Sequence, residues 1–533
     1  MTKDGVQYSL AGEFDFVVVG GGSAGCAVAG RLAEEHGATV ALLEAGPRDW
    51  SPFVHVPAGV VATVPTRHCN WAFKTEPQAA FGGRRGYQPR GRVLGGSSAI
   101  NAMIYTRGVP QDYDDWAVPG WSWDEVLPYF RRAEHNERGA DHWHGVGGPL
   151  NVADLRSPNR VSRMFVEAAQ ACGHPRNDDF NGATQEGVGY YQVTQKDGRR
   201  WSAARAYLHG QANLAVLTDA QATRVLFDGK RATGVEIRRA GRHEVVRARR
   251  EVVLSAGAFQ SPQLLMLSGI GPADGLQALG IPVIHNSPQV GQNLQDHLDY
   301  VALYASRSLD LVGISLGGAV RVAAEAVRYL ATRRGMLTTN YAEAGGFLKT
   351  DPALALPDIQ LHFVIGLVDD HARKWRFGHG MSLHVCQLRP ASRGAVTLAS
   401  ADPLARPQID PRFLSAPGDL AALVKGVRIA RRIMAGAALA SVREAELMAP
   451  RDDSDAALEA AIRARADTIY HPAGTCRMGS DAASVVDAEL RVRGVAGLRV
   501  ADASIMPRLV AGNTNAPCVM IGEKAADLLR TAL

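Results

Sequence analysis

The chain has 533 residues, which is too long for one compact core and enough for two large domains. Hydrophobic residues make up 46% and charged residues 21%, as in ordinary soluble globular enzymes, and a net charge of +5 over this length gives nucleic-acid binding little support. No apolar run approaches the roughly 18 residues of a membrane span, and the polar start lacks the apolar centre of a signal peptide. Six scattered cysteines are typical of free thiols in a reducing compartment. We therefore expect a cytoplasmic protein that binds no nucleic acid and holds no metal.

A strand–helix–strand pattern opens the folded part of the chain. The apolar run 14–19 is typical of a strand that is buried on both faces. Residues 26–35 predict a helix with small residues on its inner face, and residues 39–43 predict a second strand. This order predicts a βαβ unit of the Rossmann type.

Glycines and one acid in this unit predict a dinucleotide site. Gly20 permits the tight turn, Gly22 lets the backbone approach a pyrophosphate, and Gly25 lets helix and strand pack closely. The helix N-terminus favours phosphate charge, and Glu44 at the end of the second strand can accept hydrogen bonds from ribose hydroxyls. An acid at this position disfavours NADP, whereas NAD and FAD both remain.

Three later segments and the last helix favour a flavin. Residues 91–108 are too rich in glycine and serine for a strand and too apolar for a linker, so they predict a loop against a flat ring or a phosphate. Residues 251–271 predict strand, small-residue turn and helix, and residues 497–507 a strand ending at Asp502. A helix is expected over 522–529. Because segments assigned to the nucleotide-binding domain lie at both ends of the chain, this domain is expected to be discontinuous.

Four motifs resemble those of the glucose–methanol–choline oxidoreductases, and the resemblance covers almost the whole chain. These motifs are "GRVLGGSSAIN", "GAFQSPQLLMLSGIG", "HPAGTCRMG" and "GNTNAP". The resemblance implies an FAD enzyme that takes a hydride from an alcohol carbon. Within the family, the sequence most resembles bacterial choline dehydrogenases and primary alcohol or polyethylene glycol dehydrogenases.

The resemblance implies an α/β fold (α+β overall) made of two parts. A discontinuous Rossmann-like FAD-binding domain is expected over 14–155, 215–305 and 490–533. A substrate-binding domain built on a mostly antiparallel sheet is expected over 156–214 and 306–489.

The same resemblance implies that His471 is the active-site base and that Asn515 is its partner. Taken alone, His471 is as readily interpreted as a satisfied histidine at a strand end. An alcohol has a pKa of roughly 16 and histidine one near 6.5, so complete proton transfer would cost about 13 kcal/mol. The site must therefore stabilise alkoxide character, and the Asn515 amide N–H can donate to the developing negative oxygen.

The predicted FAD contacts lie in the glycine-rich and small-residue segments. The residues are Gly20, Gly22, Ser23, Ala24, Gly25, Glu44, Ala45, Val93, Gly95, Gly96, Ser97, Asn101, Ala102, Met103, Ile104, Val225, Ala256, Asp502 and Ala503. Family members with covalent flavin carry a histidine immediately before the asparagine of the first signature. This chain has Ile100 before Asn101, so FAD is expected to be held non-covalently.

The substrate candidates are Trp71, Tyr341, Glu343 and Phe363. Trp71 is also a good core residue, and Glu343 reads equally well as a structural acid. In the strand predicted over 359–366, either Gln360, His362 and Val364 or Leu361 and Phe363 face the pocket. Strands are also expected over 382–388 and 395–400. Choline would require a cation site with aromatic faces, and we favour a neutral primary alcohol over choline.

We expect a dehydrogenase that oxidises a primary alcohol to an aldehyde and passes electrons to a quinone or another non-oxygen acceptor. Alternatives are an alcohol oxidase (aryl-alcohol or choline), a choline dehydrogenase and, in another class, a flavin-containing hydroxynitrile lyase. Residues 316–335 predict a basic amphipathic helix, with four arginines against Glu325. Its apolar face either packs on its own domain or contacts an anionic membrane surface, such as the inner membrane.

Overall fold

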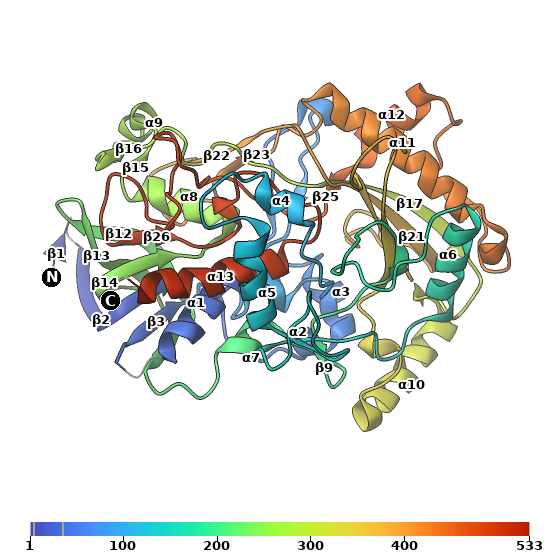
Figure 1. Cartoon of the computed structure of the whole chain (residues 1–533), viewed down its shortest axis with the longest axis horizontal. Helices are drawn as coiled ribbons and strands as arrows, with labels where there is room; N and C mark the ends of the chain where they lie inside the picture. The colour runs from blue at the N-terminus through green and yellow to red at the C-terminus, as the bar shows by residue number, and fades with distance from the viewer. Residues whose placement is uncertain (1, 4–5, 35–36, 532–533) are drawn as a thin grey trace.

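The computed structural model describes residues 2–3, 6–34 and 37–531. Within these residues two eight-stranded sheets organise the molecule and occupy its two halves (Figure 1). The predicted α/β architecture, with a Rossmann-like part and a second sheet, is confirmed. The first sheet has the order β11-β3-β2-β14-β13-β12, with β1 beside β2 and β26 beside β14. Its strands are β1 (Thr2–Lys3), β2 (Val6–Val19), β3 (Val40–Leu43), β11 (Leu214–Leu217), β12 (Ala220–Asp228), β13 (Arg231–Arg239), β14 (Arg242–Leu254) and β26 (Leu498–Val500).

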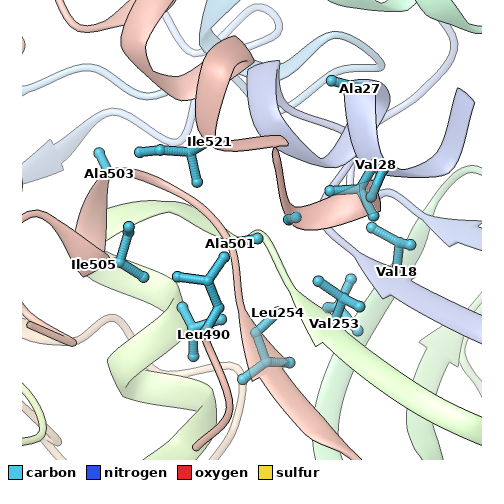
Figure 2. Close-up of a cluster of buried hydrophobic side chains, with 14 of the residues drawn as sticks. Val18, Ala27, Val28, Val253, Leu254, Leu490, Ala501, Ala503, Ile505 and Ile521 are labelled. Atoms are coloured by element: carbon cyan, nitrogen blue, oxygen red, sulfur yellow. The ribbon is translucent and has the colours of Figure 1, made fainter. Parts of the chain in front are cut away.

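The core of the first sheet forms around β2, which runs parallel to both β3 and β14. The last four residues of β2, Phe16–Val19, are apolar and buried, as expected for a central parallel strand. Helices α1 (Ser23–Ala33) and α13 (Asn515–Arg530) pack together beside it. A Cβ at Gly522 would lie 2.5 Å from the Ala24 carbonyl oxygen, so glycine is needed for this close crossing. Figure 2 shows side chains from both ends of the chain meeting in this core.

The second sheet is antiparallel along the order β24-β17-β21-β20-β19-β8, with β18 beside β21 and β25 beside β17. Helices α6 (Arg160–Ala171) and α11 (Pro417–Met434) cover one face of it, and α12 (Asp455–Arg465) packs against α11. Its strands are β8 (Gly187–Tyr190), β17 (Leu298–Ser306), β18 (Gly313–Ile314), β19 (Ala342–Leu348), β20 (Ile359–Val364), β21 (Gly378–Gln387), β24 (Glu446–Leu447) and β25 (Asp467–Thr468).

Some predicted boundaries differ from the structure. Strand β17 pairs with β21, so it belongs to the second sheet, whereas the predicted range 215–305 placed it with the first domain. The segment expected as a strand over 395–400 forms β22 (Ala395–Thr397), which pairs only with β23 (Gln408–Asp410). The C-terminal helix begins at Asn515, seven residues before the predicted start at 522. Among the described residues, no helix has both the length and the apolarity that crossing a membrane requires.

Candidate active site

A cavity of about 680 Å³ runs from the glycine turn after β2 to His471, between the two sheets. Its volume falls in the range that small-molecule and cofactor sites occupy. The first sheet and its connections line one end, which we call the nucleotide end. Strands β20 and β21 and the loop around His471 line the other, which we call the substrate end.

Each glycine of the turn after β2 has a separate steric requirement. Gly20 has φ of 103°, and a Cβ there would lie 2.4 Å from the Ser255 carbonyl oxygen. A Cβ at Gly25 would lie 1.9 Å from the Gly20 carbonyl oxygen, so this glycine lets α1 approach the turn. A Cβ at Gly22 would meet nothing closer than 4.0 Å, because this residue borders the cavity. The tight turn at Gly20 and the close packing at Gly25 are as predicted, and the approach of a pyrophosphate to Gly22 stays a prediction.

The nucleotide end has the donors and the acceptor that a dinucleotide needs. Gly22 is the N-cap of α1 and no side chain caps this helix, so its first N–H groups are available to a phosphate in the cavity. The buried Glu44 carboxylate accepts hydrogen bonds from the N–H of Gly21 (3.0 Å) and of Gly46 (2.7 Å). Burial raises the pKa of Glu44 to about 7. These residues fit a pyrophosphate and a ribose.

Most of the predicted cofactor residues line the cavity. They are Gly20, Gly22, Ser23, Ala24, Glu44, Ala45, Gly96, Ser97, Asn101, Ala102, Met103, Ile104, Ala256, Asp502 and Ala503. Four others do not. Gly25 packs against Gly20, the Gly95 N–H donates to the Gly21 carbonyl at 2.7 Å, and Val93 lies in a small apolar core.

Val225 is the fourth predicted cofactor residue that lies away from the cavity. It is buried in the core of the first sheet, and its N–H donates to Ser268 Oγ at 2.8 Å. Ala222, three residues earlier on β12, lines the cavity instead. The register of β12 on β13 shifts between Ala222 and Arg224, and a shift of this kind changes which residues face the cavity.

His471 lies at the substrate end, in the loop that follows β25. It is buried and lines the cavity. Its Nδ1 is 3.0 Å from His297 Nδ1, and its Nε2 is 3.2 Å from Asn513 Nδ2. Burial, and then the neighbouring His297 and His362, hold the pKa of His471 well below the ordinary histidine value, so the ring is neutral near pH 7.

The hydrogen bonds of His297 fix which nitrogen of His471 carries the proton and which has a lone pair. His297 Nε2 lies 3.0 Å from the Leu388 carbonyl oxygen, which can only accept, so this nitrogen carries the proton. Burial lowers the pKa of His297 to about 3, so its ring is neutral and its Nδ1 is an acceptor. His471 must then donate from Nδ1. Its Nε2 is therefore left with a lone pair that faces Asn513 and the cavity.

Asn513, and not Asn515 as predicted, is the asparagine next to His471. The Asn513 Oδ1 accepts from Gln360 Nε2 (3.1 Å) and Thr106 Oγ1 (3.2 Å), which turns its Nδ2 towards His471. Asn515 is the first residue of α13, and its Oδ1 accepts from Ser23 Oγ at 2.7 Å. Because the chain enters a helix between these positions, the two side chains point to different ends of the cavity.

Comparisons with known proteins identify the family. Models of the GMC oxidoreductase family match residues 14–299 and 390–522. The chain belongs to the GMC oxidoreductase family. It is thus an FAD-dependent oxidoreductase that acts on CH–OH groups.

Relatives of this GMC oxidoreductase match along nearly its whole length. An alcohol dehydrogenase (acceptor) from Pseudomonas putida is 46% identical over 526 residues, which is 97% of this chain and 95% of the relative. The mitochondrial choline dehydrogenase of Homo sapiens is 44% identical, covering 97% of this chain and 90% of the relative. The crystal structure of pyridoxine 4-oxidase from Mesorbium loti superposes with a TM-score of 0.87 at 35% identity, covering 97% of this chain and 99% of that structure.

Two predicted substrate residues of this GMC oxidoreductase line the cavity, and two do not. Trp71, stacked on Phe73, and Tyr341 both border it. Glu343 is buried away from the cavity and accepts hydrogen bonds from Asn159 N–H, Ser162 Oγ and Thr339 Oγ1.

Phe363 also lies outside the cavity. It stacks on Phe165 of α6 with ring centroids 4.7 Å apart, in the core of the second domain. The alternate residues of β20 face the other way, so His362 and Val364 line the cavity. Both ring nitrogens of His362 are buried and have no hydrogen-bond partner among the described residues.

Sequence reasoning missed three supporting residues of the His471 loop. Asp296 accepts from the His471 N–H at 3.0 Å and from Thr468 Oγ1 at 2.5 Å. Arg90 is half-buried and donates to the Tyr470 carbonyl at 2.7 Å, and His297 fixes the tautomer of the His471 ring. Asp296 and His297 follow one another in "NLQDHL" just before β17, a stretch without a periodic signal.

Proposed function

We propose that this GMC oxidoreductase oxidises a neutral primary alcohol to the aldehyde, with His471 as the base. The observation that carries the proposal is the unprotonated Nε2 of His471, which faces the cavity 3.2 Å from an amide donor, Asn513 Nδ2. An alcohol oxygen in the cavity within hydrogen-bond distance of both nitrogens can donate its proton to His471 Nε2 and accept a hydrogen bond from Asn513 Nδ2. This pair supplies a base and a stabilising donor at the same atom.

The reaction removes one hydride and one proton from the CH–OH group. Bound FAD supplies the hydride acceptor. His471 Nε2 takes the hydroxyl proton, so the ring becomes an imidazolium only as the hydride departs. Asn513 Nδ2 donates to the oxygen while negative charge develops on it, and Gln360 and Thr106 keep this donor in place.

The lining of the nucleotide end would hold FAD without a covalent bond. The N-terminus of α1 would bind the pyrophosphate, and Glu44 would bind a ribose. Ile100 lines the cavity at the position where covalent family members carry histidine, and its side chain has no nucleophilic atom. Flavin should therefore leave the polypeptide on acid precipitation.

A neutral alcohol fits the cavity better than choline. Glu44 and Asp502 are the carboxylates among the described lining residues. Both already accept hydrogen bonds, Glu44 from two backbone N–H groups and Asp502 from Ser261 Oγ at 2.6 Å and Gly257 N–H at 2.8 Å. Neither is close to His471 in the hydrogen-bond network, and Asp296, which accepts from the His471 N–H, does not line the cavity. No lining carboxylate among the described residues would therefore offset a quaternary ammonium there.

We also propose that the electrons pass to a quinone or another acceptor in preference to oxygen, and that the protein works in the cytoplasm. The relative named alcohol dehydrogenase (acceptor) supports this choice, whereas the likeness to pyridoxine 4-oxidase favours the alternative of an oxidase.

Anaerobic flavin reduction tests the reaction. A straight-chain primary alcohol added to the purified holoprotein should bleach the oxidised flavin band, and the His471→Ala holoprotein should not bleach at a comparable rate. An unchanged wild-type band would contradict the proposal and would favour a lyase.

Reoxidation of the flavin tests the electron acceptor. The reduced protein is mixed with air or with a soluble quinone analogue. Faster reoxidation by the quinone is expected, and stoichiometric hydrogen peroxide at full turnover would instead identify an oxidase.

A further inference from the structure

Helix α10 (Leu316–Thr332) exposes the apolar side chains that an amphipathic helix usually buries. Figure 1 shows it at the lower right, projecting away from both sheets. Four of its large apolar side chains are largely exposed: Leu316 (90%), Val320 (72%), Val327 (69%) and Leu330 (70%). A solvent-exposed apolar surface of this kind marks an interaction site.

The polar contacts of α10 hold it so that this stripe faces outwards. At 3.6 residues per turn, the four exposed residues fall within about 80° of one another. Gly318 and Tyr329, its buried residues, lie on roughly the opposite side. Tyr329 Oη donates to the Gly198 carbonyl at 3.1 Å, and Glu325 accepts from the Met336 N–H at 2.6 Å. The helix is therefore anchored through its less apolar side.

A neighbouring loop extends the apolar surface to the rim of the cavity. Ile314, just before α10, forms a bridge with Phe377, and Trp375 lies two residues earlier. Phe377 (80%) and Trp375 (77%) are largely exposed. Ile314 and Trp375 also line the cavity that contains His471, as does the exposed Val61. We call Leu316, Val320, Val327, Leu330, Trp375 and Phe377 the α10 patch.

The charged residues beside the α10 patch are mostly basic. Residues 316–335 contain four arginines and one glutamate. On the helical wheel Arg321 and Arg328 lie on one side of the helix, about 80–100° from the edge of the apolar stripe, and they face Asp310 (4.0 Å) and Glu325 (3.2 Å). Arg333 and Arg334 follow the C-terminal end of the helix. Exposed aromatic and aliphatic side chains on a segment with a net positive charge suit the boundary between acyl chains and anionic headgroups. A second copy of the chain suits this patch less well, because an isologous contact would bring the arginines of both copies together.

We infer that the α10 patch docks the protein on an anionic phospholipid membrane, with α10 lying in the interface and the cavity rim next to the lipid. The docking itself rests on the exposed patch and its arginines. Its consequence for catalysis rests on the proposed function: a lipid-soluble alcohol or quinone would reach His471 from the membrane past Ile314 and Trp375.

Vesicle co-sedimentation of the full-length holoprotein tests the docking. Wild type should pellet with phosphatidylglycerol/phosphatidylcholine vesicles, and raising the salt concentration or omitting phosphatidylglycerol should weaken binding. The double variant Leu316→Ser/Leu330→Ser should lower the partition coefficient at least about tenfold. Leu354→Ser, which changes an exposed leucine (38%) outside the patch, is the matched control and should bind as wild type does. Dye-linked turnover of a soluble alcohol should be unchanged in both variants, because none of these residues lines the cavity.

Equal pelleting of wild type and the α10 double variant, or no pelleting of wild type with anionic vesicles, would overturn the inference. A dimer in light scattering that the double variant abolishes, without vesicle binding, would also overturn it and would assign the patch to a second copy. Pelleting is measured without substrate, so failure of the docking and failure of the proposed alcohol oxidation give separate results.

Discussion

The two ends of the cavity are built in different ways. At the nucleotide end the decisive groups are backbone N–H groups and the missing side chains of glycines, all within a short strand–helix unit. At the substrate end they are side chains from distant segments: His297 before β17, His471 after β25 and Asn513 before α13. Changes at the nucleotide end should therefore remove the cofactor, whereas changes at the substrate end should leave it bound and slow the chemistry.

The largest effect is expected from Gly25→Ala. The new Cβ would lie 1.9 Å from the Gly20 carbonyl oxygen, and backbone atoms of the turn would have to move. We expect this variant to purify with little or no flavin, measured as the ratio of flavin to protein absorbance. Gly275→Ala is the control, because a Cβ there meets nothing within 4 Å. A full flavin content in Gly25→Ala would show that the close approach of α1 to the turn does not require glycine at this position.

The second effect is that of His471→Ala. This variant should retain FAD, because His471 lies at the substrate end of the cavity and the glycine turn at the nucleotide end, but its rate of flavin reduction by alcohol should fall about 10²–10⁴-fold. Stopped-flow reduction under anaerobic conditions measures the rate. His209→Ala, at an exposed position, should reduce like wild type. Near-normal reduction in His471→Ala would exclude it as the base.

The two asparagines sharpen the comparison, because they are two residues apart and belong to opposite ends. Asn513→Ala removes a donor to the reacting oxygen and should slow flavin reduction roughly 10²-fold with FAD retained. Asn515→Ala removes the hydrogen bond to Ser23 and should weaken FAD retention more than it slows reduction. Stopped-flow rates and flavin content of both variants decide the assignment, and the reverse pattern would restore Asn515 as the catalytic partner.

Sequence reasoning succeeded where the relevant signal is local. The turn after β2, the helix and Glu44 lie within one short stretch, and the structure places them in the predicted order. The helix begins three residues early, at Ser23, and β2 begins at Val6, eight residues before the predicted strand. The sequence also showed that side chains of β20 alternate between two faces of the strand. Only the packing of Phe363 on Phe165 determines which of the two faces is turned towards the cavity.

Other parts of the site depend on tertiary contacts. Asn513 and Asn515 are the same residue type in one motif, and only the start of α13 separates their directions. The pairing of His297 with His471 joins positions 174 residues apart, and neither position carries a periodic pattern that would indicate it. The helical period of 316–335 predicted α10, but the outward direction of its apolar side follows from the anchoring of Tyr329 and Glu325.

The smallest effect is expected at His297, a positioning residue. His297→Leu removes the acceptor for His471 Nδ1–H, so both neutral tautomers become populated and one well-placed hydrogen bond is lost. At about 1 kcal/mol for such a bond, kcat should fall about fivefold with little change in KM. His297→Gln, whose side-chain oxygen can accept, should recover part of the loss.

The pH profile separates this role from a merely structural one. Protonated His471 cannot accept the alcohol proton, so activity is lost as the pH falls through its pKa. Because burial holds that pKa well below the ordinary value of 6.5, wild-type kcat/KM should stay level from pH 8 down to 6.5 and decline only below it. In His297→Leu the neutral acceptor that stabilises the protonated His471 ring through Nδ1–H is removed, so the acid limb should move to still lower pH. A lower kcat with an unmoved acid limb would mean that His297 supports the fold of the loop and does not set the state of His471.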